Sequence, residues 1–411
     1  MSEEIRGFRV AVGDDVLDDL RARLRNTRWP DAELVDDWSQ GIPLAYVQDV
    51  CRYWAEEYDW RAREALLNRF DQYVTEIDGV DIHVIHQRSS NPDALPLLIT
   101  HGWPGSIAEF QKVIEPLTEP GAHGGDQADA FHVIAPSLPG FGFSGKPATP
   151  GWGVEKIADM WAELMTRLGY GRFLAQGGDW GSAVTNAIAA QHPDRCIAAH
   201  MTLAMSVRPS SDPTEPEELR AIERLTYYRE HDSGYSTQQA TRPQTLGYGL
   251  ADSPAGQAAW ILEKFWAWTD CDGHPEHVLT RDELLDNVML YWVTNSATSS
   301  ARLYWESFGG RRRRPPVSIP VGFAVYPAEI VPPVRKWVEL AFADVRHWAE
   351  YDRGGHFAAF EVPDTFVADL RTCFREYRTS GAGSELSGQG TVAPPRAGGQ
   401  LGPGTRCPVR W

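Results

Sequence analysis

Residues 177–182 read Gly-Gly-Asp-Trp-Gly-Ser, and the residue at the centre of this stretch is Asp179. The pattern predicts a sharp turn from a strand into a helix, because glycine adopts backbone conformations that strain other residues. The central side chain then stands at the edge of a sheet, beside the N-terminus of the helix. Hydrolases with this turn usually carry serine at the centre. A carboxylate is already an anion and needs no base to activate it, so aspartate favours displacement at a saturated carbon over acyl transfer.

Short apolar runs alternate with glycine-rich loops and helical stretches before and after this turn. Such alternation is typical of a mostly parallel sheet covered by helices. Two strands, over residues 73–77 and 80–87, flank Asp78-Gly79, a dipeptide that favours a tight hairpin. Further strands are predicted over residues 97–100, 131–135, 173–176, 197–201, 321–325 and 347–351.

The hydrophobic pattern divides the chain into five parts. Helices are predicted near the N-terminus over 14–26 and 43–68, and near the C-terminus over 363–378. Residues 379–411 contain eight Gly and four Pro, a composition typical of disordered segments. The parts are an N-terminal helical extension (1–70), the first part of the core (71–207), an inserted helical lid (208–314), the second part of the core (315–378) and a low-complexity, disordered tail (379–411).

The net charge of the chain argues against some classes of binding partner. The sequence holds 39 basic and 56 acidic residues, a net charge of −17. So acidic a surface repels phosphate backbones and anionic lipids, and we expect no nucleic-acid partner. The five cysteines have no paired or metal-ligand spacing, which indicates a reducing compartment. The N-terminus lacks the apolar core of a signal peptide, and no run approaches the ~18 apolar residues of a membrane span. We therefore expect a cytoplasmic protein without a membrane anchor.

Four loops at the predicted carboxyl ends of strands carry groups suited to catalysis. The turn at Asp179 supplies a nucleophile, the loop after 321–325 supplies Glu329, and the loop after 347–351 supplies His356. The chain order of nucleophile, acid and base is that of the α/β-hydrolase fold. The fourth loop, His-Gly-Trp-Pro-Gly-Ser at 101–106, directs a backbone N–H into the same place. Together with the N–H of Trp180, the N–H of Trp103 would form an oxyanion hole.

Each of these residues also has an ordinary structural interpretation. Aspartate is a common helix cap, and a single histidine in a loop is seldom a base. The orienting acid could also be Glu350, Asp352 or Asp344, and the two tryptophans could belong to the core. The combination of four loops, in the right order and at the right strand ends, favours catalysis over these separate interpretations.

Several longer segments carry a resemblance to a known family. The chain resembles the epoxide hydrolases of the microsomal and juvenile-hormone type from about Phe8 to Arg378. The matching segments are Thr27-Arg28-Trp29-Pro30, the loop at 101–106, Pro136-Ser137-Leu138-Pro139-Gly140-Phe141-Gly142-Phe143-Ser144, Gly177-Gly178-Asp179-Trp180-Gly181, Gly322-Phe323-Ala324-Val325-Tyr326-Pro327-Ala328-Glu329 and Arg353-Gly354-Gly355-His356-Phe357.

The resemblance implies an α/β-hydrolase fold and a set of roles. It makes Asp179 the nucleophile, Glu329 the acid that orients the base, and His356 the base. The family also has two lid tyrosines that bind the epoxide oxygen. Tyr304 in Ser-Ala-Arg-Leu-Tyr-Trp-Glu matches one motif well, and Tyr235 in Ser-Gly-Tyr-Ser matches the other more loosely. The rivals for the second role are Tyr227, Tyr228, Tyr248 and Tyr291.

The expected reaction converts an apolar or aryl epoxide and water into a vicinal diol through an alkyl ester on Asp179. We expect Trp103, Trp180 and Phe357 to line the substrate pocket, and the lid rings, among them Trp260, to leave room for a bulky substrate. No metal or organic cofactor is expected, and a homodimer is compatible with the aromatic-rich surface. The alternatives are a haloalkane dehalogenase-like hydrolase and a non-catalytic relative that binds a small ligand. A role in detoxification and a role in secondary metabolism both fit.

Overall fold

The computed structural model describes residues 4–204, 212–308 and 316–378. Nine strands within these residues form one sheet, in the order β1-β2-β3-β5-β4-β6-β7-β8-β9. The pairs from β1 to β5 along the first edge are antiparallel, and the pairs from β5 to β9 are parallel. The strands are β1 (Ile5–Phe8), β2 (Gln72–Ile77), β3 (Val80–Gln87), β4 (Leu95–Thr100), β5 (Phe131–Pro136), β6 (Phe173–Gly177), β7 (Cys196–Met201), β8 (Val321–Val325) and β9 (Val345–Glu350).

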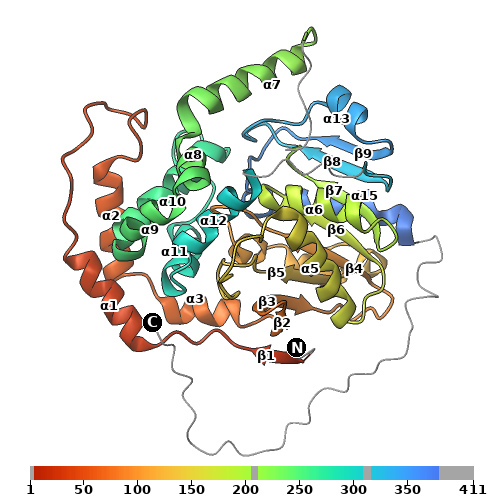
Figure 1. Cartoon of the computed structure of the whole chain (residues 1–411), viewed down its shortest axis with the longest axis horizontal. Helices are drawn as coiled ribbons and strands as arrows, with labels where there is room; N and C mark the ends of the chain where they lie inside the picture. Colours follow the sequence, from red (N-terminus) through yellow and green to blue (C-terminus); the bar gives the residue numbers. More distant parts are fainter. Residues whose placement is uncertain (1–3, 205–211, 309–315, 379–411) are drawn as a thin grey trace, which may run out of the picture.

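Helices cover the sheet and form a separate layer beside it. Figure 1 shows α5 and α6 next to each other in front of the central strands, and α8 to α12 grouped at the left. None of the helices in the described residues is long and apolar enough to cross a membrane. The helices are α1 (Asp14–Arg25), α2 (Leu44–Glu56), α3 (Trp60–Leu67), α4 (Ile114–Thr118), α5 (Val154–Arg167), α6 (Trp180–Gln191), α7 (Pro216–Tyr227), α8 (Gly234–Thr241), α9 (Pro243–Asp252), α10 (Pro254–Trp268), α11 (Arg281–Val293), α12 (Ala297–Phe308), α13 (Arg335–Ala341), α14 (Ala358–Glu361) and α15 (Pro363–Phe374).

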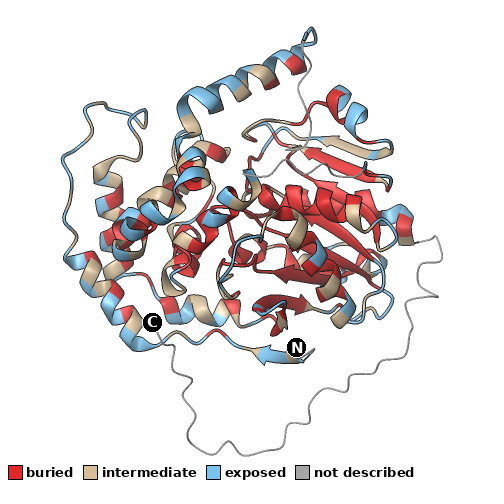
Figure 2. Cartoon of the chain, viewed as in Figure 1, coloured by how far each residue is buried: buried red, intermediate tan, exposed pale blue. Residues whose placement is uncertain are grey.

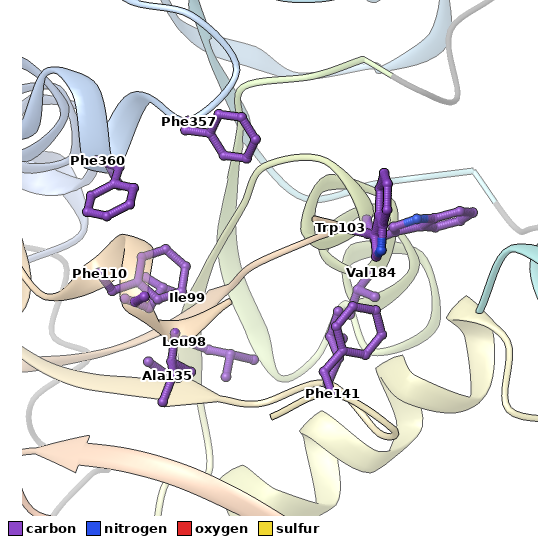
Figure 3. Packing of buried hydrophobic residues seen from close by; sticks show 14 of the residues in the cluster. Leu98, Ile99, Trp103, Phe110, Ala135, Phe141, Val184, Phe357 and Phe360 are labelled. Atoms are coloured by element: carbon purple, nitrogen blue, oxygen red, sulfur yellow. The ribbon is translucent and has the colours of Figure 1, made fainter. Parts of the chain in front are cut away.

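The core lies around the central strands. Every residue of β4, β5, β6 and β7 is buried, as expected for parallel strands covered on both faces. Figure 2 shows these strands buried along their length, whereas α7 is mostly exposed. The core cluster joins strand residues such as Leu98 and Ile99 to Val184 of α6 and to Phe357 and Trp103 of two loops, as Figure 3 shows. The loops that carry Trp103 and Phe357 are therefore packed against the buried core of the sheet.

The α/β-hydrolase fold predicted from the sequence is confirmed, with two local corrections. The predicted helical extension also contains β1, which adds an edge strand by pairing with β2. The stretch 43–68, predicted to be helical, holds two helices, because α2 ends at Glu56 and Asp59 caps α3 by accepting a hydrogen bond from the N–H of Ala62 at 3.2 Å. The predicted tail (379–411) and the predicted start of the lid at 208 lie outside the described residues.

Six helices, α7 to α12, lie between β7 and β8 in the described chain. The N-terminal helices are bonded to this layer. Arg63 of α3 forms a short ion pair with the buried Asp286 of α11, and the Tyr58 hydroxyl donates to the same carboxylate at 2.8 Å. Because breaking a buried ion pair leaves an uncompensated charge, these bonds hold α11 against the extension.

The turn between β6 and α6 has the geometry that the sequence predicts. Asp179 has φ 48° and ψ −127°, a conformation that strains any residue with a β-carbon. The turn also passes very close to the end of β4. A β-carbon added at Gly181 would lie 1.8 Å from the carbonyl oxygen of Thr100, so only glycine fits there. The backbone itself thus holds Asp179 against the neighbouring loop.

This strain predicts an inverted order of stability at position 179. Glycine usually makes a chain less stable than alanine by about 0.5–1 kcal/mol. At Asp179 the order should reverse, and Asp179→Gly should unfold with a free energy about 1–3 kcal/mol higher than that of Asp179→Ala. Urea denaturation of both variants measures the difference. The matched control is Ala183→Gly within α6, where glycine should lower the stability. An Asp179→Ala variant at least as stable as Asp179→Gly would contradict strain at this turn.

Candidate active site

The carboxylate of Asp179 lies where three loops meet. Its Oδ1 accepts a hydrogen bond from the backbone N–H of Trp103 at 2.8 Å. Its Oδ2 lies 3.3 Å from Nε2 of His356. The approach of the first loop is close, because a β-carbon added at Gly102 would lie 2.1 Å from Oδ1. Trp180 is the first residue of α6, but within the described residues its N–H makes no hydrogen bond to this carboxylate.

The predicted acid and base lie side by side behind this carboxylate. Nδ1 of His356 lies 2.6 Å from Oε1 of Glu329, and both side chains are buried. The same Oε1 accepts the N–H of Ile330 at 2.7 Å, which fixes the carboxylate. The rival acids Glu350 and Asp352 are exposed, and Asp344 is partly exposed. The structure therefore brings Glu329, rather than its rivals, to His356.

Two carboxylates control the charge of His356. Burial by itself lowers the pKa of the ring, because an imidazolium loses its hydration. The charges of Glu329 and Asp179 outweigh this effect and raise the pKa of His356 well above its usual range. The ring is therefore an imidazolium between two anions at neutral pH. Removing the charge of Asp179 would remove part of what holds the proton on the ring.

The loop that carries His356 is bonded to the end of α10. The N–H of His356 donates to the carbonyl of Trp268 at 2.8 Å, and the Trp268 ring packs against the imidazole with centroids 5.1 Å apart. The side chain of Glu361 accepts the N–H groups of Phe357 and Asp270 at 2.9 and 2.8 Å. These bonds orient the ring from two sides.

The loop at 101–106 is held by α11. The side-chain amide of Asn287 donates to the carbonyl of Pro104 at 2.7 Å, and the Tyr291 hydroxyl donates to the carbonyl of Gly105 at 2.7 Å. Burial lowers the pKa of His101 to about 4, so this ring is neutral. Its Nε2 accepts the N–H of Leu138 at 3.2 Å. His101 thus joins two loops of the site and stays uncharged.

The two predicted lid tyrosines meet above Asp179. Tyr235 of α8 stacks on the Trp103 ring with centroids 4.9 Å apart, and Tyr304 of α12 meets the Trp180 ring edge-on at 4.8 Å. The two tyrosine rings are 5.8 Å apart. Burial raises the pKa of both phenols well above their usual range, so both are neutral donors.

The rival tyrosines differ in position. Tyr227 and Tyr248 are exposed, and the Tyr291 hydroxyl is bonded to a carbonyl. Tyr228 alone among the four rivals lines the same cavity as Asp179. Its hydroxyl lies 3.2 Å from the hydroxyl of Tyr235, so it is placed to support Tyr235.

Asp179 lies between two cavities of very different size. The larger one, of about 370 Å³, is lined by Asp179 together with Tyr235 and Tyr304. The smaller one, of about 20 Å³, is lined by Asp179 and His356. Among the described residues Asp179 alone lines both. The remaining wall of the larger cavity is mostly apolar and includes Leu203, Leu225, Phe308, Ile330, Val334 and Trp337.

The predicted pocket residues are distributed over both cavities. Trp180 lines the larger cavity, whereas Trp103 and Phe357 line the smaller one. The lid ring Trp260 lines a separate cavity next to α10. The walls of the larger cavity come instead from α7, α12 and the segment after Glu329. Two polar residues that line the smaller cavity, Glu109 and Gln176, were not predicted from the sequence. Glu109 could have been found from Ser106-Ile107-Ala108-Glu109, a capping-box pattern.

One group of side chains has the composition of a metal site. His200, His347 and Asp369 have ligand atoms within 4.8 Å of one another. Nε2 of each ring lies 2.7–2.8 Å from the Asp369 carboxylate, which also accepts the Tyr351 hydroxyl at 2.6 Å. His347 and Tyr351 are hydrogen-bonded to Asp369 and link β9 and the segment after it to α15. Nε2 of His200 and Oδ2 of Asp369 are close to each other, but within the described part of the chain neither atom has a hydrogen-bond partner.

Two family models and several known proteins match the chain. Residues 5–110 match the family model for the epoxide hydrolase N terminus, and residues 96–230 match that for the alpha/beta hydrolase fold. A relative from Stigmatella aurantiaca, whose name provisionally assigns it to the epoxide hydrolases, is 52% identical over 91% of this chain and 86% of its own length. Epoxide hydrolase 1 of Sus scrofa is 36% identical over 90% of this chain and 88% of its own length.

Solved structures lead to the same family. Juvenile hormone epoxide hydrolase from the silkworm Bombyx mori superposes with a TM-score of 0.83 at 32% identity, over 91% of this chain and 95% of that one. The epoxide hydrolase of Aspergillus niger gives a TM-score of 0.81 at 32% identity, over 91% and 96% of the two chains. With relatives of this similarity along most of its length, the chain belongs to the epoxide hydrolase family.

Proposed function

We propose that this epoxide hydrolase opens an apolar or aryl epoxide by forming a covalent alkyl ester on Asp179, which water then hydrolyses to a vicinal diol. The observation that carries the proposal is the position of Asp179, which faces two neutral phenols in one cavity and a histidine in another. Family membership sets aside the haloalkane dehalogenase and the non-catalytic alternatives.

In the first step an oxygen of Asp179 attacks one carbon of the epoxide. The N–H of Trp103 already binds Oδ1, so Oδ2 is the oxygen free to attack. A new bond joins Oδ2 to carbon while the ring carbon–oxygen bond breaks, and its electron pair stays on the epoxide oxygen. Tyr235 and Tyr304 hydrogen-bond that oxygen, and one of them gives it a proton. Neutral phenols suit this role because they become useful acids only as the alkoxide forms.

In the second step His356 removes a proton from a water molecule that attacks the ester carbonyl. The ester carries no charge, so one of the two anions that raise the pKa of His356 is gone. The imidazolium then gives its proton to the tyrosinate left by the first step, and the neutral ring can act as a base. The N–H of Trp103, joined by that of Trp180, stabilises the oxyanion. When the intermediate collapses, the acid form of Asp179 gives its proton to the departing alkoxide. The proton that His356 took from the water stays on the ring, so the enzyme is restored with an imidazolium, an ionised Asp179 and two neutral tyrosines.

The larger cavity supports an apolar substrate. Its volume of about 370 Å³ is within the range of small-molecule sites, and most of its wall is aliphatic or aromatic. Burying apolar surface there gives binding energy of roughly 25 cal/mol per Å². Asp179 and the two tyrosines supply the polar groups that orient the ring of the epoxide.

His356→Gln should separate the two steps. The variant keeps Asp179 and the tyrosines, so the ester should form with styrene oxide, but its hydrolysis lacks a base and the ester should accumulate. Intact-protein mass spectrometry should show an increase equal to the mass of the epoxide. The matched control is His192→Gln, whose ring pairs with Asp159 in a partly exposed position and should not matter. Unchanged turnover in His356→Gln would remove this histidine from the mechanism.

The tyrosines should act only in the first step. Tyr304→Phe and Tyr235→Phe should each slow ester formation by about 10²-fold, because each loses a donor to the epoxide oxygen. Hydrolysis of ester that has formed should keep its rate. Rapid-quench sampling of the ester measures both rates. Tyr248→Phe, at an exposed tyrosine, is the control and should keep the rate of ester formation, whereas Tyr228→Phe should slow it less than Tyr235→Phe does. A large loss with Tyr228→Phe and none with Tyr235→Phe would exchange the two roles.

A further inference from the structure

The smaller cavity beside Asp179 has the size of a single water molecule. Its volume is about 20 Å³, and a cavity needs only about 10–15 Å³ to hold one water. A buried water also needs two to four polar partners. The lining offers Asp179, His356, Glu109, Gln176 and Thr202. Size and polarity together distinguish this cavity from the dry voids that apolar cores contain.

Two buried polar atoms on this lining have no hydrogen-bond partner. Nε2 of His356 is one, since its approach to Asp179 at 3.3 Å is poorly aligned. Oε1 of Gln176 is the other, and the Gln176 side chain is only 2% exposed. A buried polar atom without a partner costs about 1–3 kcal/mol. One water molecule bonded to both atoms would remove both costs.

The position of Gln176 is fixed by the sheet. It lies in β6, three residues before Asp179, where it is opposite Ile99 of β4 and His200 of β7. A central strand paired on both sides has little freedom, so the backbone of Gln176 is held in place three residues before the nucleophile. Such a group can set the position of a water molecule without moving during the reaction.

Glu109 approaches the cavity from another element. It closes the capping box of the short helix η1 (Ile107–Phe110), with Oε1 accepting the N–H of Ser106 at 3.1 Å. Loss of hydration raises the pKa of Glu109 to about 8, so its carboxyl group is mostly protonated at neutral pH. A protonated carboxyl both donates and accepts, and it adds no charge beside Asp179.

We propose that Gln176, assisted by Glu109, positions the water molecule that hydrolyses the ester on Asp179. The inference rests on the proposed ester mechanism. Gln176 accepts one proton of the water in a hydrogen bond, and Nε2 of His356 takes the other proton as the oxygen attacks Cγ of Asp179. The water is thus ready in a different cavity from the epoxide, with Asp179 as the one lining residue, among those described, that the two cavities share. Gln176 is a positioning residue and takes no proton.

Gln176→Met tests this role, since methionine has a similar length but no strong acceptor. In a single turnover of styrene oxide, ester formation should keep its rate within about twofold, and ester hydrolysis should slow at least tenfold, the effect of losing one hydrogen bond. Rapid-quench mass spectrometry follows both steps. Normal ester formation also shows that the variant is folded. If Gln176→Met does not fold, Gln176→Asn replaces it, because its amide is too short to reach and the same selective slowing is expected.

The matched control is Thr185→Val in α6. Its Oγ1 is also buried without a partner, but it lies outside the lining of the cavity, so neither step should change. Ester hydrolysis at the normal rate in Gln176→Met would overturn the inference, and so would an equal slowing of both steps, which indicates a structural role alone. If His356→Gln still accumulates ester, the mechanism survives that result. Absence of ester in every variant would instead overturn the ester mechanism itself.

Discussion

The site depends on one carboxylate held in a backbone conformation that aspartate rarely adopts. Asp179 lies at the turn between β6 and α6 with φ 48°. The backbone passes so close to its neighbours at Gly102 and Gly181 that the turn packs directly against the end of β4. This position gives its two oxygens different surroundings. Oδ1 is bound by the Trp103 N–H, and Oδ2 is left near His356. If the backbone at Asp179 adopted an unstrained conformation, the carboxylate would move away from both the Trp103 N–H and His356. The loops around it could not follow, because their own hydrogen bonds fix them.

In the proposed mechanism the same carboxylate separates the two reactants. An epoxide in the larger cavity meets Asp179 and two neutral phenols, whereas a water in the smaller cavity meets His356. Charge then sets the order of events. The free enzyme holds an imidazolium between two anions, a poor base. In that mechanism, ester formation removes one anion and lets the imidazolium give up its proton, so a neutral base is available only when there is an ester to hydrolyse. Thus the charges of the buried triad and the two separate cavities both favour ester formation first and hydrolysis by water second.

Much of this site could be predicted from the sequence, because α/β folds place functional loops at the carboxyl ends of strands. Apolar runs located those ends within a few residues, and the fold then brought Asp179, Glu329 and His356 together. The edge strand β1 could not be predicted, since its short, exposed sequence becomes a strand only by pairing with β2. The lining of the cavities was also out of reach. Which rings of the lid face the nucleophile depends on how the helices pack. A role for Gln176 could not be predicted either, because it depends on the small cavity next to its side chain.

The covalent bond to Asp179 is the central claim, and the fate of one oxygen atom tests it most directly. A single turnover with excess enzyme in water enriched in heavy oxygen should place the label in the carboxylate of Asp179, detected by mass spectrometry of the peptide that contains it. The diol from that turnover should carry the original oxygen of Asp179. Label in the diol together with an unlabelled Asp179 would contradict the account, because it would mean that water attacks the epoxide directly.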